Sequence, residues 1–185
     1  MQIVFYDLET TIPADHIIEF GCVAVDSETF AEVESFETLI YSDRITDWSV
    51  SANGITPAMV ADAPRIDQVI EVMYDYLHGR IWAGHNIVGF DNPIIHRTFT
   101  DLGLEPPKPA GMIDTLPLTR KHLADQVENH KLATLAAHYG LGPEDHRSLS
   151  DARMCRDVLK CMNLRRLSKQ YAEGTTKSNL TGDAK

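Results

Sequence analysis

Acidic residues stand at three separate places where the pattern of apolar residues predicts the end of a strand or the start of a helix. Asp7 and Glu9 follow a short apolar run, Asp91 opens a helical segment after a second run, and Asp151 lies near the start of the last helical segment. Residues two apart in a strand point to the same side, so Asp7 and Glu9 form a pair of carboxylates. Because ligand sites in open α/β sheets favour the strand ends, we expect all four acids to meet at one sheet edge.

Each acid also has an ordinary structural explanation. A lone Asp-x-Glu pair is often solvated at a strand end, and an aspartate at a helix start, such as Asp91, is favoured as a cap and by the helix dipole. Ser148-x-x-Asp151 has the spacing of a capping box. The combination of the sites is what indicates chemistry, because carboxylates that repel one another need a cation between them. A site made only of oxygen ligands suits Mg²⁺ or Mn²⁺.

A histidine completes the predicted chemistry. Two such metal ions about 3.5–4 Å apart can stabilise both the attacking and the leaving oxygen of a phosphodiester. His146 lies on a predicted loop five residues before Asp151. An imidazole titrates near neutral pH and can take a proton from an attacking water molecule. The residues therefore predict hydrolysis of a phosphodiester, although a loop histidine by itself is usually just exposed.

The elements that must position these residues alternate between strand and helix patterns. The expected strands are 3–6, 17–25, 30–41, 80–84 and 112–114, and the expected helices are 66–77, 91–102, 131–139 and 149 to about 167. This order predicts an α/β fold with a mixed sheet, in which three antiparallel strands precede parallel strands and helices flank the sheet. A chain of 185 residues with 43% hydrophobic composition fits one domain. Neither a signal peptide nor a membrane-spanning run is expected.

The charge balance limits how the chain can hold a polyanion. A net charge of −10 argues against coating nucleic acid by bulk electrostatics, so any nucleic acid must be gripped locally. The most basic segment is the last helix, with Arg153, Arg156, Lys160, Arg165, Arg166 and Lys169. A solvated helical face is the favoured interpretation, and steering of phosphates together with Arg147 and Lys131 is the alternative. The other histidines have no trustworthy ligand spacing.

Two further residue types limit the interpretation. Trp48 and Trp82 are expected to be packing residues, although an exposed Trp48 would favour base stacking. The three cysteines form no CxxC pair, which argues against a disulfide framework or a zinc knuckle and indicates a reducing intracellular compartment.

With these residues in view, the sequence resembles the DEDDh exonucleases, the histidine-bearing branch of the DnaQ-like 3′–5′ exonucleases on a ribonuclease H-like fold. The resemblance covers roughly residues 3–167, and it indicates an exonuclease domain over 1–169 followed by a flexible polar tail, 170–185. The three motifs are Phe-Tyr-Asp-Leu-Glu-Thr-Thr at 5–11, His-Asn-Ile-Val-Gly-Phe-Asp at 85–91, and His146 with Asp151 in the H-x₄-D spacing. Family-like segments also stand at 18–21, 53–56, 113–115 and 132–136.

The resemblance implies roles for individual residues. Two Mg²⁺ ions, with Mn²⁺ able to substitute, would be held by Asp7, Glu9, Asp91 and Asp151, while His146 would be the general base. The terminal nucleotide of DNA or RNA would contact Thr10, Thr11, Asn86 and Phe90, and backbone groups after the first motif would recognise its 3′ hydroxyl. Ile12-Pro13 stands where many members have glycine, which changes the expected shape of that pocket.

Segments 79–86 and 141–149 resemble plant exonuclease-domain proteins of the sieve-element enucleation (NEN) type. That resemblance implies a nuclear or cytoplasmic location, and a homodimer remains open. Two other functions also remain open, namely a non-catalytic module of the same fold that binds nucleic acid or protein, and a structure-specific endonuclease.

Overall fold

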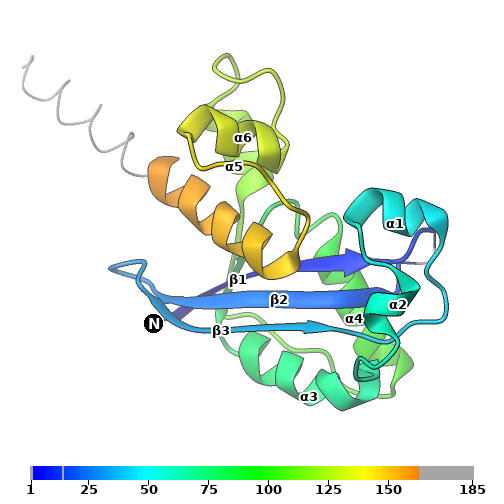
Figure 1. The fold of residues 1–185 in the computed structure, drawn as a ribbon. Helices are drawn as coiled ribbons and strands as arrows, with labels where there is room; N and C mark the ends of the chain where they lie inside the picture. Colours follow the sequence, from blue (N-terminus) through cyan, green and yellow to red (C-terminus); the bar gives the residue numbers. More distant parts are fainter. Residues whose placement is uncertain (1, 14, 163–185) are drawn as a thin grey trace, which may run out of the picture.

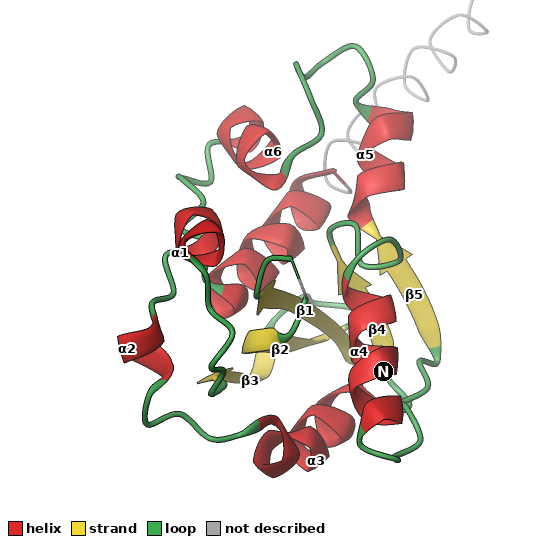
Figure 2. Ribbon diagram, turned by 90° about the vertical axis from the view of Figure 1, so that its right-hand side faces the viewer, coloured by secondary structure: helices red, strands yellow, loops and turns green. Residues whose placement is uncertain are grey.

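The protein is built around a five-stranded mixed sheet. A computed structural model describes residues 2–13 and 15–162. The strand order is β3-β2-β1-β4-β5. Figure 1 labels β1, β2 and β3, and Figure 2 labels β4 and β5 as well. β1 (Gln2–Thr10), β2 (Ile17–Asp26) and β3 (Glu32–Leu39) are antiparallel, and β4 (Ile81–Gly84) and β5 (Gly111–Asp114) run parallel to β1. The predicted fold class is confirmed.

Helices cover both faces of this sheet. They are α1 (Asp47–Asn53), α2 (Pro57–Val60), α3 (Ile66–Leu77), α4 (Asp91–Asp101), α5 (Thr115–His122), α6 (Leu132–Tyr139) and a C-terminal helix over residues 148–162. The helices α1, α2 and α5 were not predicted. With seven and four residues, α1 and α2 are too short to show a clear helical period in the sequence. In α5 the two leucines, Leu116 and Leu118, stand two positions apart, which is not a helical spacing.

The boundaries of two strands, β1 and β3, differ from the prediction by two residues or more, and β3 ends at Leu39 and not at Tyr41. β1 continues past Asp7 to Thr10, because its pairing with β2 extends through Glu9 and beyond, so Asp7 lies within the strand instead of ending it. β3 begins at Glu32 and not at Phe30, since Phe30 has a φ of 57° in the preceding turn. Both corrections concern the ends of elements, where sequence patterns are weakest.

Strand alternation divides the core into two layers. Val4, Tyr6 and Leu8 pack with residues of α3 and α4 on one face of the sheet. Ile3 and Phe5 point to the other face, where they pack with residues of α6 and the C-terminal helix. Figure 2 shows α3 below the sheet and α6 above it. Asp7 and Glu9 continue this second row, so their carboxylates lie on the face that the C-terminal helix covers.

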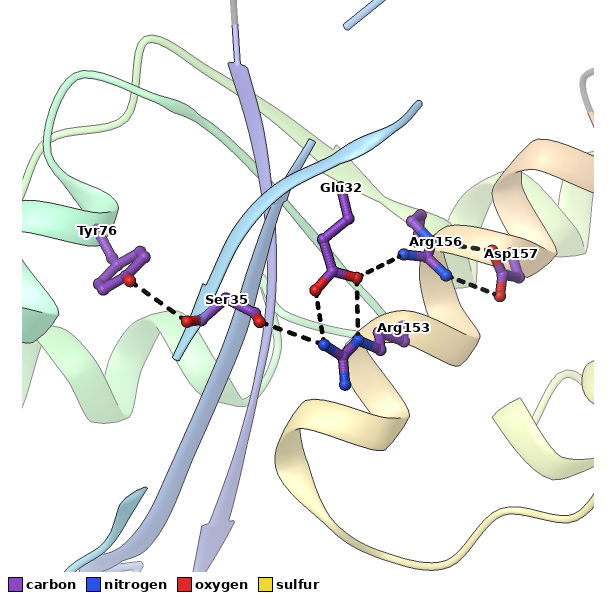
Figure 3. A network of polar contacts seen from close by, with 6 residues as sticks. All are labelled: Glu32, Ser35, Tyr76, Arg153, Arg156 and Asp157. Atoms are coloured by element: carbon purple, nitrogen blue, oxygen red, sulfur yellow. Dashed lines mark hydrogen bonds and ion pairs between the residues drawn. The ribbon is translucent and has the colours of Figure 1, made fainter. Parts of the chain in front are cut away.

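Ion pairs attach the C-terminal helix to the edge strand β3. Arg153 donates to Glu32 at 2.6 and 3.1 Å and to Ser35 Oγ at 3.2 Å, while Arg156 donates to Glu32 at 3.2 Å and to Asp157 at 2.9 Å (Figure 3). These ion pairs argue against the alternative that the two arginines steer phosphates, and they also show that the two side chains are not simply solvated.

The other basic positions of this segment have different outcomes. Lys160 is exposed, whereas Arg165, Arg166, Lys169 and the predicted tail 170–185 lie outside the described residues. Within 2–13 and 15–162, none of the helices has both the length and the apolar character needed to cross a membrane.

Candidate active site

The first part of the site forms where β1 runs past the end of β4. Parallel pairing between these strands stops at Phe5 and Ala83, and Asp91 begins α4 directly beyond that point. The last residue of β4 lies close to β1, since a Cβ atom on Gly84 would lie 2.9 Å from the carbonyl oxygen of Tyr6. Asp91 is buried.

Asp114, the last residue of β5, holds the loop between β4 and α4. Its Oδ1 accepts hydrogen bonds from the backbone N–H groups of Asn86 at 2.9 Å and Leu116 at 3.0 Å, and its Oδ2 accepts from the N–H of Val88 at 3.1 Å. Asn86 has a φ of 65° in this loop. Asp114 is thus a positioning residue, and its only signal in the sequence was the family-like segment 113–115.

The C-terminal helix reaches the site by resting directly on β2. Strand pairing places Gly21 opposite Asp7 and Glu19 opposite Glu9, so all four face this helix. A Cβ atom on Gly21 would lie 2.2 Å from the backbone nitrogen of Leu149. Only glycine permits this contact between strand and helix backbones.

A buried carboxylate anchors the start of the same helix. Glu19 is fully buried and accepts hydrogen bonds from the Arg147 guanidinium, with one Nε–Oε1 distance of 3.0 Å. It also accepts from the N–H of Ser148 at 2.9 Å and from the Ser148 hydroxyl at 3.2 Å. Glu19 therefore fixes the segment on which His146 and Asp151 are carried.

These contacts bear on two interpretations that were made from the sequence. The capping-box interpretation of Ser148-x-x-Asp151 is wrong, because the Ser148 hydroxyl bonds to Glu19 and the Asp151 N–H donates to the Arg147 carbonyl. The Arg147 guanidinium pairs with the buried Glu19 carboxylate, which argues against the interpretation that it steers phosphates. Glu19 was missed as a site residue, although it stood in the family-like segment 18–21.

Three of the predicted site residues converge. One ligand atom each from Glu9, His146 and Asp151 lies within 4.8 Å of the others. His146 is exposed on its loop with a φ of 54°, while Asp151 is buried. Asp91 Oδ1 and Asp151 Oδ1 are buried without a hydrogen-bond partner in the described part of the chain. Buried polar atoms normally have partners, so these two oxygens point to a missing ligand.

The pKa values of the four acids also point to a missing ligand. Burial raises the pKa of Asp7 well above its usual range, and the Asp91 carboxylate raises it further. Burial raises the pKa of Glu9 to about 8, with Asp151 as the next cause. Burial also raises the pKa of Asp91 to about 7, and burial followed by Glu144 raises the pKa of Asp151 to about 7. A cation would relieve this repulsion, and the oxygen donor set fits Mg²⁺ or Mn²⁺.

The residues predicted to bind the terminal nucleotide fall into two groups. Asn86 and Phe90 are exposed, whereas Thr10 and Thr11 are buried. The Thr11 hydroxyl accepts from the N–H of His16 at 3.1 Å, which holds the turn between β1 and β2. Thr10 and Thr11 thus shape the turn beside the acids.

The unpredicted helix α1 borders this turn. Asn53 donates to the Thr10 carbonyl at 3.2 Å, and the N–H of Ile12 donates to Ser49 Oγ at 2.9 Å. Trp48 of α1 is 71% exposed, so the packing interpretation was wrong for it. Trp82 is 4% exposed and donates to the Leu77 carbonyl, which confirms its packing role.

Comparison with known protein families identifies the family of this chain. A family model described as exonuclease, of the RNase T type, matches residues 4–159. This chain belongs to that exonuclease family.

Several relatives share the exonuclease region. Protein NEN4 of Arabidopsis thaliana is 43% identical over 167 residues, which cover 86% of this chain and 66% of NEN4. Protein NEN2 of the same plant is 41% identical, and the match covers 34% of its length. A PolC-type DNA polymerase III of Caldanaerobacter subterraneus is 32% identical over 162 residues, or 85% of this chain and 11% of the polymerase. This chain therefore spans only part of the length of each of these relatives. Its resemblance to the plant NEN type is confirmed.

Solved structures share the fold. Escherichia coli exonuclease I in complex with a 5cy-dT13 oligonucleotide superposes with a TM-score of 0.77 at 19% identity, covering 90% of this chain and 41% of that one. Exonuclease X in complex with 5′ overhanging duplex DNA superposes with a TM-score of 0.64 at 25% identity, covering 87% and 89% of the two chains.

A cleft of about 690 Å³ opens beside the acids of this exonuclease-family domain. Asp7, Glu144 and His146 line it together with Arg120 and Lys131. The cleft thus joins acidic and basic side chains within one hollow of a strongly acidic chain. His85 and His130, which had no trusted ligand spacing in the sequence, also line this cleft. Their place beside Asp7 depends on the packing of segments far apart in the sequence.

Proposed function

We propose that this chain is a metal-dependent 3′–5′ exonuclease domain that hydrolyses phosphodiester bonds at the 3′ end of DNA or RNA and releases nucleoside monophosphates. The observation that carries the proposal is the convergence of Glu9, His146 and Asp151 within 4.8 Å. The unpartnered buried oxygens of Asp91 and Asp151 support it. Membership of the exonuclease family makes nuclease chemistry the natural use of this cluster.

The acids and the histidine have separate roles in this proposal. Asp7, Glu9, Asp91 and Asp151 would hold two Mg²⁺ ions, with Mn²⁺ able to substitute, and these ions would neutralise the acids and the charge on the phosphate. His146 takes a proton from the attacking water molecule. A bond forms between this oxygen and phosphorus, and the bond from phosphorus to the 3′ oxygen of the preceding nucleotide breaks. That oxygen receives a proton from solvent.

The surroundings of the acids suggest where the substrate lies. Exposed Asn86 and Phe90 and the turn at Thr10 and Thr11 would surround the terminal nucleotide. Arg120, in the adjoining cleft, would contact the phosphates of the strand that enters the site. The DNA in the exonuclease I and exonuclease X complexes supports nucleic acid as the substrate class. We further propose that the domain comprises residues 1–169 and acts in the nucleus or cytoplasm.

Digestion of 5′-labelled single-stranded and duplex DNA and RNA with Mg²⁺, Mn²⁺ or EDTA tests the proposal. We expect stepwise shortening from the 3′ end that needs a divalent metal and is lost in Asp7→Ala and His146→Ala. Lys108→Gln, which changes an exposed side chain that pairs with Glu105, is the matched control. Cleavage of circular DNA would instead indicate the endonuclease, and binding without cleavage of any substrate would indicate the non-catalytic module.

A further inference from the structure

A second hollow, of about 420 Å³, lies beside the turn between β1 and β2. It is bounded by that turn, by the segment after β3, by the start of α3 and by α4, and it shares no lining residue with the cleft beside Asp7. Three arginines line it: Arg44, Arg65 and Arg97. We call this hollow the arginine pocket.

The three guanidinium groups keep most of their donors available. Arg97 donates to the backbone carbonyl of Asp15 at 2.7 Å, and Arg65 lies over the Tyr41 ring at 4.8 Å. Arg44 donates to His16 Nε2 at 2.9 Å. A guanidinium carries five N–H donors, so each of these contacts leaves others for a ligand.

Carboxylates neutralise this group of arginines only weakly. Among the described residues, the one ion pair that these arginines form is Arg44 with Asp43, at 4.0 Å between side chains that are 63% and 79% exposed. An exposed pair at that distance contributes little. Planar guanidinium groups with unused donors are the usual protein partners of phosphate.

Acidic side chains are also present at the pocket, in the same number as the arginines. Three aspartates also line it: Asp15, Asp43 and Asp101. Burial lowers the pKa of His16 most, and the charges of Arg44 and Arg97 come next. The opposing effects of Asp101 and Asp15 are smaller. In a chain with a net charge of −10, a group of three arginines with one weak ion pair among the described residues favours an anionic ligand.

The arginine pocket is tied to the proposed 3′-end site by the same turn. His16 donates its N–H to the Thr11 hydroxyl, and the N–H of Thr11 donates to the His16 carbonyl at 2.9 Å. If the terminal nucleotide lies at this turn, the strand being shortened ends there and has no further phosphate to offer. A phosphate bound beyond the turn must then come from another strand.

We propose that the arginine pocket binds a backbone phosphate of the complementary strand when the substrate is a duplex with a recessed 3′ end. This inference rests on the proposed function, because it assumes that a 3′ end occupies the turn. The pocket would then favour duplex over single-stranded substrates.

Equilibrium binding measured by fluorescence anisotropy in EDTA tests the pocket without cleavage. The ligands are a duplex with a recessed 3′ end and the corresponding single strand, and the variants are Arg44→Gln, Arg97→Gln and the control Lys108→Gln. We expect each arginine variant to weaken duplex binding roughly threefold or more and to reduce the salt slope of log K by about 1, because one phosphate contact is lost. Single-strand binding and the control should stay unchanged.

The outcomes separate this inference from the proposed function. Equal loss on both ligands, or no loss on either, in variants with an unchanged melting temperature would overturn the strand assignment. An NMR titration of His16 with inorganic phosphate shows whether the pocket binds free phosphate. Saturable phosphate binding, together with unaltered duplex affinity in the arginine variants, would also overturn the strand assignment. Absence of cleavage by the wild-type protein overturns the proposed function alone, since the anisotropy measurement needs no turnover.

Discussion

Substitution of Gly21 by alanine tests how the C-terminal helix delivers its part of the site. The added Cβ atom would lie 2.2 Å from Leu149 N, 2.5 Å from the carbonyl carbon of Ser148 and 2.7 Å from Leu149 Cα. All three are backbone atoms, so no side chain can rotate away. Reaching an ordinary contact near 3.4 Å requires the helix start to move by about 1 Å, which overpacking studies associate with a loss of about 1–3 kcal/mol.

The displacement should affect turnover more than stability. His146 precedes the contact by two residues and Asp151 follows it by three, so both move away from Glu9. A misplacement of about 1 Å in a catalytic group can reduce the rate about 100-fold. The assay is the rate of mononucleotide release at saturating Mg²⁺, together with chemical denaturation of the same samples.

Gly111→Ala is the matched control. It also replaces a strand glycine, but its Cβ atom would lie 3.6 Å from the nearest atom, a side-chain carbon of Ile81. We expect this variant to keep its rate and stability nearly unchanged. A Gly21→Ala protein with the wild-type rate, or an equal loss in the two variants, would refute the argument that the helix start must touch β2.

The remaining predictions concern the groups around that helix and the acids. Glu19→Gln should destabilise the protein by about 1–3 kcal/mol in denaturation experiments, because the partly exposed Arg147 loses its anionic partner; an unchanged free energy of unfolding would contradict this. Asp151 has a pKa raised from 3.8 to about 7, so the unfolded chain releases this proton near pH 4 and the folded protein near pH 7. The free energy of unfolding of the metal-free protein should therefore fall as the pH rises from about 4 to about 7, by at most about 4 kcal/mol from this group. Asp151→Asn should make the free energy of unfolding depend less on pH in this range. Mg²⁺ should raise the melting temperature more at pH 8 than at pH 5, and an equal shift at both would argue against the carboxylates as ligands. Asp114→Ala should raise KM for the nucleic acid several-fold, because the backbone N–H groups of Asn86 and Val88 lose their acceptor; unchanged steady-state kinetics would exclude this positioning role.

Local sequence patterns were sufficient to predict the strand and the helix starts that carry the candidate site residues. The period of two in the first strand places Asp7 and Glu9 on one face, and this holds even though the strand runs on to Thr10. The helix starts at Asp91 and Ser148 were also predicted to within one residue, because a proline in the first turn and the spacing of apolar residues are local signals. The antiparallel pairing of the first three strands followed from the short connections between them.

Only the tertiary structure decided which side chains serve the site and which serve the fold. Arg147 and Arg153 looked equally basic in the sequence, and both are engaged by carboxylates of β2 and β3 that lie more than 100 residues away. Glu19 is an acid in an apolar strand, and its partners become known only when the helix start packs onto Gly21. Sequence periodicity reports which face of an element is buried, whereas pairing between distant segments depends on the packed geometry. The residues proposed for the chemistry were therefore found from the sequence, and the side chains that position them were found only from the fold.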